Sequence, residues 1–209
     1  MCNEYAQTKP QKAMRDLFNV TDRLGNLAPQ PNIYPDQSAP IIRAGTDGWQ
    51  MVMARWGLPS PQFALQGKRT DRGVTNVRNT ASPHWRRWLS PASRCLVPVT
   101  SFAEPRGKGL GNAWFRLVDP ETQAFFAGLQ VPGWRSTRKL KDGETVDDLF
   151  AFLTTEPNAE VVPIHPKAMP VILTSRAEWE TWMLAPWAEA QLLQRPLPDG
   201  ALVVGDAPS

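Results

Sequence analysis

The chain has 209 residues, of which 42% are hydrophobic and 21% are charged, so a folded, soluble protein is expected. No apolar run approaches the ~20 residues that a membrane-spanning helix requires, which excludes such a span. Residues 1–5 lack the basic and apolar regions of a signal peptide, and we expect a cytoplasmic protein with no membrane partner.

Positive charge is unevenly distributed along the chain. The net charge is only +3, but residues 68–88 contain six cations and the single acid Asp71. Clustered cations favour a phosphate-backbone partner, although a solvated basic face is the alternative interpretation. Several of the nine tryptophans adjoin arginines, as in residues 85–88. Aromatic rings stack on unpaired bases while arginines bind phosphates, but most of the tryptophans are expected in the core.

Before residue 90 the sequence predicts short elements separated by long loops. Met14, Leu17 and Phe18 share one face of a short helix, and Ser82-Pro83 is a typical helix start. In chain order we expect a helix at 10–19, a Pro/Asn-rich loop at 26–40, a strand at 49–56, a polar loop at 59–73 and a helix at 82–89.

Strands dominate the rest of the chain. Beta-branched and aromatic runs bounded by turn residues predict strands at 94–102, 113–118, 124–131, 149–155 and 169–173. We expect a charged, mobile loop at 136–148 and one helical turn at 157–162. Ser175 and Glu178 form a capping box that opens one helix, and Pro186 opens another that runs to Gln194.

These elements predict one α+β domain over residues 1–209, with a core at about 2–195 and a loose tail at 196–209. Many short strands favour a barrel-like sheet, mixed or antiparallel, with short helices at its periphery. The chain has two cysteines and two histidines, and their positions match no zinc spacing. We therefore expect no metal, no cofactor and no disulfide, and we expect a monomer.

Cys2 directly follows the initiator methionine, and a small second residue permits removal of Met1. The α-amine, with a reference pKa of about 7.7–8.0, and the thiol, of about 8.5, would then lie on adjacent carbons. Such a 1,2-aminothiol captures an aldehyde first as an imine and then as a thiazolidine ring. The simpler alternative is an ordinary cysteine near a frayed terminus.

Three further polar residues stand where apolar strands end, which is a common place for catalytic groups. They are Asn76, Glu104 and His165. Taken singly, each also fits a structural role: a turn residue, a surface acid before Pro105, and a histidine satisfied within a loop.

Seven short motifs, in order over residues 1–175, resemble the SOS-response-associated peptidase (SRAP) family of abasic-site processing proteins. They are Met1-Cys2, Asn32-Ile33-Tyr34-Pro35, Arg55-Trp56-Gly57-Leu58-Pro59, Asn76-Val77-Arg78, the stretch from Arg94 to Glu104, Leu153-Thr154-Thr155, and the stretch from Ile164 to Leu173.

The resemblance implies that Cys2, after Met1 is removed, crosslinks to the ring-opened aldehyde of an abasic site in single-stranded DNA during the DNA damage response. It implies that Asn76 holds the reacting terminus, that Glu104 shuttles protons, and that His165 protonates the sugar oxygen. By resemblance, Arg78, Trp56 and Pro35 line the DNA-binding face, and Arg86, Arg87 and Thr155 are further residues expected to contact DNA. An imine at C1′ acidifies the neighbouring carbon, so AP-lyase side activity is also expected.

The chain departs from the family pattern beside Cys2, where Asn3-Glu4 replaces the usual Gly-Arg and Glu4 would repel phosphate. Ala103 and Pro105 flank Glu104 where aromatic residues are expected. Two alternatives stay open. One is a thiol peptidase that uses Cys2, His165 and Glu104, and the other is a non-covalent single-stranded DNA-binding module that uses residues 68–78 and 85–88.

Overall fold

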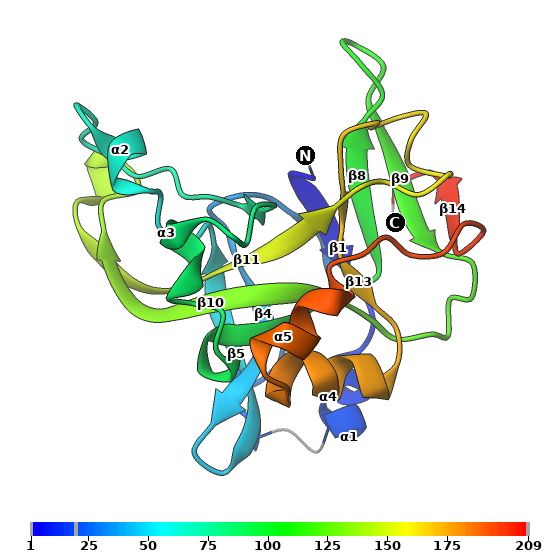
Figure 1. Ribbon diagram of the computed structural model, residues 1–209, viewed down its shortest axis with the longest axis horizontal. Coiled ribbons are helices and arrows are strands. Elements are labelled where there is room, and N and C mark those ends of the chain that lie inside the picture. Colours follow the sequence, from blue (N-terminus) through cyan, green and yellow to red (C-terminus); the bar gives the residue numbers. More distant parts are fainter. Residues whose placement is uncertain (1, 19–20, 208–209) are drawn as a thin grey trace.

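Fourteen short strands form two sheets in a computed structural model that describes residues 2–18 and 21–207 (Figure 1). The smaller sheet is antiparallel, in the order β14-β9-β8-β1-β3. Strand β1, which lies between β8 and β3, begins two residues after Cys2. The bounds are β1 (Glu4–Gln7), β3 (Gln30–Ile33), β8 (Ser101–Pro105), β9 (Asn112–Leu117) and β14 (Leu202–Gly205).

The larger sheet is mixed, in the order β12-β11-β10-β7-β4-β5-β2, with β13 paired to β10. Most pairs are antiparallel, but β11 runs parallel to both β5 and β6. The bounds are β2 (Thr21–Asp22), β4 (Ser38–Gly45), β5 (Gly48–Trp56), β6 (Asn76–Val77), β7 (Arg94–Val99), β10 (Ala124–Ser136), β11 (Thr145–Thr155), β12 (Met169–Pro170) and β13 (Ile172–Leu173).

An aromatic cluster joins the two sheets. The ring of Tyr5 on β1 meets Trp56, Phe126 and Phe152 of the larger sheet edge to face, with centroids 5.2, 5.5 and 6.0 Å apart. All four side chains are fully buried. Burial of each ring stabilises the fold by roughly 1.5–3 kcal/mol, so the sheets pack as one unit. The strand-rich α+β fold with a barrel-like sheet is therefore confirmed.

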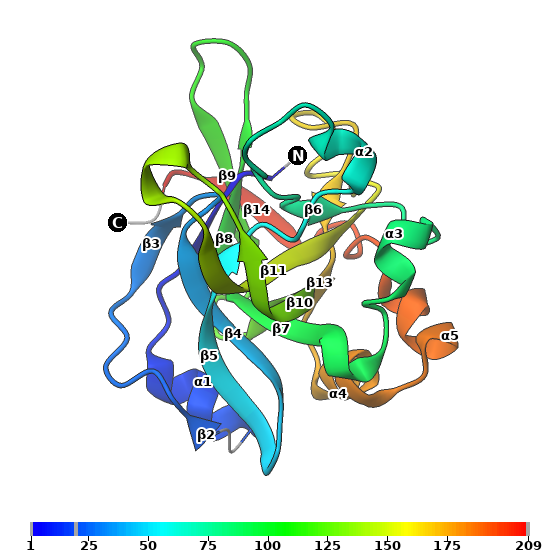
Figure 2. The same ribbon diagram turned by 90° about the vertical axis from the view of Figure 1, so that its left-hand side faces the viewer.

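Short helices cover the outside of the larger sheet (Figure 2). The predicted capping box opens α4, because Ser175 accepts from the amide of Glu178 and the Glu178 carboxylate accepts from the amide of Ser175. Trp182 on α4 is buried and donates from Nε1 to the Cys95 carbonyl at 3.0 Å. The bounds are α1 (Gln11–Phe18), α2 (Gln62–Leu65), α3 (Pro83–Arg86), α4 (Arg176–Leu184) and α5 (Trp187–Ala190), with 3-10 turns at Pro91–Ser93, Leu140–Asp142 and Gln191–Leu193.

Several predicted elements differ from the structure. The expected strand at 94–102 is two strands, since the chain leaves the larger sheet after Val99 and enters the smaller one at Ser101. The expected mobile loop at 136–148 is mostly a hairpin, because β10 and β11 extend to Ser136 and from Thr145. The loop at 26–40 contains β3 and the start of β4. These strands are held by pairing with distant segments and not by a local hydrophobic pattern. Asn19, the last residue of the predicted first helix, lies outside the described residues.

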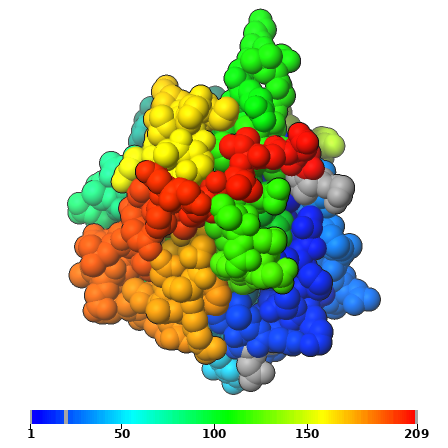
Figure 3. Space-filling view, turned by 90° about the vertical axis from the view of Figure 1, so that its right-hand side faces the viewer, coloured from blue at the N-terminus to red at the C-terminus, as the bar shows by residue number. Residues whose placement is uncertain are grey.

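The prediction of a loose tail is wrong for residues 196–207. Strand β14 pairs along β9, where Leu202 lies opposite Leu117 and Gly205 opposite Trp114. Leu202 is 4% exposed and belongs to the core cluster between the sheets. Figure 3 shows this segment, in red, lying across the face of the molecule. Residues 208–209 lie outside the described part of the chain.

Leu202→Ala is expected to destabilise the protein by about 2–5 kcal/mol, because it leaves a cavity between the sheets. The melting temperature should fall by ~2–4 °C for each kcal/mol. Val204→Ala on the same strand is the matched control, since Val204 is 45% exposed and its loss should cost less than about 1 kcal/mol. Equal melting temperatures for the two variants would contradict the packing of β14.

Candidate functional site

Cys2 lies just before strand β1 of the smaller sheet and is held by hydrogen bonds at its thiol and at its carbonyl. Its side chain is 1% exposed, and its thiol donates to the Glu4 carbonyl at 3.3 Å. Its own carbonyl accepts from Nδ2 of Asn76 at 2.8 Å. Residue 2 is therefore fixed by groups on both sides and is not part of a frayed end. Met1 lies outside the described residues.

Asn76 approaches Cys2 from the larger sheet. Strand β6 runs parallel to β11, with Asn76 opposite Phe152 and Val77 opposite Leu153. The side chain of Asn76 is buried, and its Nδ2 also donates to Oγ1 of Thr75 at 2.9 Å. Its Oδ1 accepts no hydrogen bond from the residues that the structure describes. The amide thus anchors the chain at Cys2 and retains an acceptor beside it.

Glu104 and His165 complete the group. Glu104 lies on β8, next to the pair of Ala103 with Glu4 of β1, and is 1% exposed. Nδ1 of His165 lies 4.0 Å from Oε2 of Glu104 and 2.6 Å from the carbonyl of Ala168. A carbonyl only accepts hydrogen bonds, so Nδ1 carries the proton and Nε2 of a neutral ring is the basic nitrogen.

Burial sets the protonation of these groups. It raises the pKa of the Glu104 carboxyl above its ordinary value, although the nearby imidazole of His165 opposes the shift. Burial and the neighbouring Glu104 also raise the pKa of the Cys2 thiol. The site therefore holds a protonated thiol beside a carboxyl that retains its proton to a higher pH than an ordinary glutamate. This arrangement suits proton transfer by the Glu104 carboxyl more than it suits a Cys2 that rests as a thiolate.

The six side chains expected at DNA divide into two groups. Arg78, Arg86 and Arg87 are exposed and Pro35 is half-buried, so these four reach the surface. Trp56 is 0% exposed, donates from Nε1 to the Thr75 carbonyl and stacks on Phe152. Thr155 is 1% exposed, and its hydroxyl contacts Glu156 and the carbonyl of Gln194. Trp56 and Thr155 are thus buried and support the site from within, and their contact with DNA stays a prediction.

Two supporting interactions carry no signal in the sequence. The carboxylate of Glu4 is 7% exposed and accepts from Nδ2 of Asn112 at 2.6 Å, and its hydrogen bond to Tyr34 raises the pKa of that phenol. Glu4 is thus a partnered acid beneath the β8–β9 hairpin. The other is Gln194, whose Nε2 donates to the carbonyls of Arg78 and Thr154 and so ties β6 to the end of β11.

Within residues 2–18 and 21–207, no group of three or more His, Cys, Asp and Glu side chains is arranged to hold a metal ion. No helix within these ranges is long and apolar enough to cross a membrane.

A buried cysteine at residue 2, an anchoring asparagine and a glutamate–histidine pair on a two-sheet fold define a class that the comparisons identify. Residues 1–205 match the SOS response associated peptidase (SRAP) family, and the chain belongs to it. The comparison with curated proteins found no match.

Solved structures share the fold. A protein from Bacteroides thetaiotaomicron has a TM-score of 0.74 at 22% identity, over 97% of this chain and 90% of that chain. A protein from Bordetella bronchiseptica has a TM-score of 0.68 at 23% identity, over 97% of this chain and 98% of that one. A phage-related protein from the same organism has a TM-score of 0.68 at 21% identity, over 98% and 93%. At this identity the likeness concerns the fold alone.

Glu104→Gln is expected to stabilise the protein increasingly as pH rises. A raised folded-state pKa gives stability that is complete below the unfolded pKa of about 4.3 and is lost as pH rises through the folded value. Glutamine does not titrate, so the variant escapes that loss. Melting temperatures from about pH 4 to pH 8 measure the difference. Glu121→Gln, at an exposed acid, is the control, and a difference for Glu104→Gln that is constant with pH would refute the expectation.

Proposed function

We propose that this chain captures abasic sites in single-stranded DNA by forming a thiazolidine at Cys2, and so protects the lesion during the DNA damage response. The observation that carries the proposal is the burial of Cys2 beside Glu104 with its carbonyl held by Asn76. Family membership and the aldehyde chemistry of a 1,2-aminothiol support it. The proposal requires removal of Met1, which frees the α-amine of Cys2.

The first step is opening of the abasic sugar, which exists mainly as a closed hemiacetal. Nε2 of neutral His165 accepts the proton of the C1′ hydroxyl and returns it to the ring oxygen as the bond between C1′ and that oxygen breaks, which leaves the aldehyde and a neutral imidazole. The α-amine of Cys2 then adds to C1′ and gives a carbinolamine. Asn76 holds residue 2 in place by its bond to the Cys2 carbonyl, so addition becomes an intramolecular step.

The second step forms the ring. Glu104, kept protonated by burial, donates to the departing hydroxyl, and water leaves as the imine forms. The resulting carboxylate accepts the proton of the Cys2 thiol as sulfur attacks C1′, and the imine nitrogen ends as the ring amine. One water is released, and Glu104 regains its proton. A neutral thiol with a raised pKa suits this order of steps, because the Glu104 carboxylate that deprotonates it forms only in the preceding step.

The imine also acidifies the carbon next to C1′. Loss of that proton would eliminate the 3′ phosphate and cut the strand, which is the AP-lyase side activity implied by the family. Closure of the thiazolidine removes the imine and so suppresses elimination. DNA would be held by the exposed cations near the site, with Arg78 two residues after Asn76.

The family name suggests a peptidase, but the electrostatics of the site favour capture of DNA over peptide hydrolysis. A thiol peptidase needs a cysteine of lowered pKa paired with a histidine. Here burial raises the pKa of Cys2, the thiol donates to the Glu4 carbonyl, and Nδ1 of His165 donates to Ala168. Removal of Met1 from the chain itself would be the one peptide cleavage that the proposal needs.

Incubation with an abasic single-stranded oligonucleotide is expected to give a heat-stable one-to-one adduct, measured by intact mass. The mass of the free protein should correspond to loss of Met1. Cys2→Ala and any extension before residue 2 should abolish the adduct, because both remove the aminothiol. Cys95→Ala is the matched control, since Cys95 is buried and belongs to the core cluster.

An equal yield of adduct from Cys2→Ala would refute the proposal. Salt-sensitive binding without any adduct, equal for intact and abasic oligonucleotides, would instead identify a non-covalent binding module. Turnover of a peptide library that is lost in Cys2→Ala would favour a peptidase.

His165→Gln is expected to slow adduct formation by about 10²–10⁴-fold, because a positioned proton donor contributes that much to the rate. Affinity for intact single-stranded DNA should not change. Lys167→Gln, at an exposed cation of the same loop, controls for loss of charge and should leave the rate near the wild-type value. A normal rate for His165→Gln would show that the imidazole takes no part in proton transfer.

A further inference from the structure

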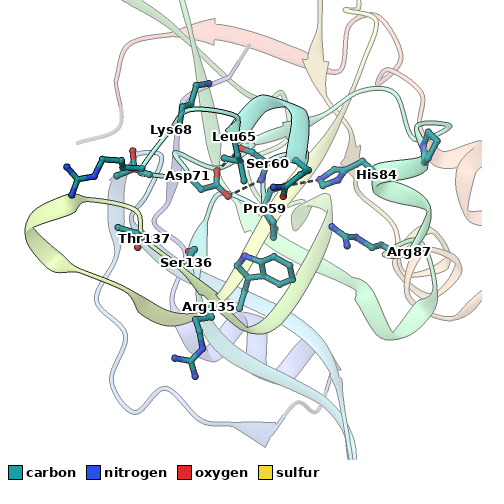
Figure 4. A pocket seen from close by; sticks show the side chains of 15 residues that line it. Pro59, Ser60, Leu65, Lys68, Asp71, His84, Arg87, Arg135, Ser136 and Thr137 are labelled. Atoms are coloured by element: carbon teal, nitrogen blue, oxygen red, sulfur yellow. Dashed lines mark hydrogen bonds between the residues drawn. The ribbon is translucent and has the colours of Figure 1, made fainter.

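A second hollow lies away from Cys2. It is a cavity of about 640 Å³ between the loop at 59–73, helix α3 and the β10–β11 hairpin (Figure 4). None of Cys2, Asn76, Glu104 and His165 lines it. Its volume is within the range of about 300–1,000 Å³ that is typical of small-ligand sites.

The charge of this cavity is positive. Lys68, Arg69 and Arg87 line it, and none of the three forms an ion pair with the residues that the structure describes. The one lining acid, Asp71, accepts from the amide and hydroxyl of Ser60 and from the amide of Gly73, at 2.6–3.0 Å. The Asp71 carboxylate is thus hydrogen-bonded within its own loop, and Lys68, Arg69 and Arg87 remain available to bind an anion.

The cavity also has an aromatic wall. Trp134 on β10 is half-buried, and it lines the hollow together with Arg87. The guanidinium of Arg87 lies 4.0 Å above the ring of Trp88 and 6.0 Å from that of Trp134. Its position is therefore fixed by stacking, at the edge of an indole that is open to the cavity. An aromatic surface beside fixed cations fits a ring that carries a phosphate.

A neighbouring hollow extends from this cavity toward the segment that precedes Asn76. It measures about 530 Å³ and shares Lys68 and Arg69 with the first, but continues past Arg72 to Gly73. Gly73 is three residues before Asn76, and an extended chain advances at most about 3.6 Å per residue, so the two lie within ~11 Å. Lys68, Arg69 and Arg72 line this hollow, which extends from the cavity toward the segment before Asn76.

We propose that the cavity binds one nucleotide unit, with its base against Trp134 and its phosphate on Arg87, Lys68 and Arg69. This proposal rests on the proposed function: the nucleotide belongs to the same single strand that reacts at Cys2, and it lies several positions from the lesion. A free nucleotide has the same chemistry, and the experiment separates the two sources.

The test measures binding of undamaged thymidine oligonucleotides of about 5 and about 15 nucleotides, and of free thymidine monophosphate. Arg87→Ala should weaken binding of the longer strand by about tenfold and reduce its salt slope by about 0.7, while the shorter strand binds as before. Trp134→Leu should cost about 1–3 kcal/mol per stacked base, or roughly 5–150-fold. Arg23→Ala, at an exposed arginine next to β2, is the matched control.

Loss of affinity for the longer strand alone supports a nucleotide of the reacting strand. Loss of affinity for the free nucleotide alone supports a nucleotide site that acts separately from the strand. Wild-type affinity of Arg87→Ala and of the loop variant Lys68→Ala/Arg69→Ala for all three probes overturns the proposal. No step requires an adduct, so failure of Cys2 to crosslink would refute the proposed function and leave this result intact.

Discussion

The hydrogen bond from Asn76 to the Cys2 carbonyl is the interaction on which the candidate site depends, because it joins the two sheets there. Cys2 leads into β1 of the smaller sheet, whereas Asn76 pairs beside β11 of the larger one. Beneath this bond, Tyr5 packs edge to face on Phe152, the strand partner of Asn76. The position of the reactive residue is therefore set by the same intersheet packing that stabilises the fold, and a shift between the sheets would move Cys2 relative to Asn76.

Burial has opposite consequences for stability and for chemistry at this position. An amide oxygen of Asn76 that accepts no bond from the described residues, and a carboxyl whose pKa is raised, both cost folding free energy. The same burial favours the protonated form of Glu104 and, in the proposed reaction, would exclude water from the imine, which hydrolysis would otherwise reverse. Groups that weaken a fold in this way are retained at functional sites and offset elsewhere, here by the aromatic cluster between the sheets.

The four candidate site residues could be proposed from the sequence because Cys2 follows the initiator methionine and the other three border apolar stretches. Their roles as neighbours could not, since Cys2, Asn76, Glu104 and His165 are brought together by pairings between distant segments. Trp56 shows the limit of a local pattern. An arginine precedes it, as at a nucleic-acid surface, but strand alternation turns the indole into the core while Arg55 pairs with Asp36 and Asp147. The tail was misjudged because β14 is stabilised by its partner β9 and not by its own composition.

The charge around Cys2 differs between the two sides of the site. On the side of the β8–β9 hairpin, Glu4 occupies the place where the family has an arginine, and its carboxylate is held by Asn112. On the other side, the loop at 59–73 and α3 present Lys68, Arg69, Arg72 and Arg87 with one acid, Asp71, whose oxygens bond to the loop itself. A phosphate backbone is attracted to the second flank and gains little from the first. In the proposed function, Glu4 would therefore direct the DNA strand toward the basic loop, which is the side where the cavity beside Trp134 lies.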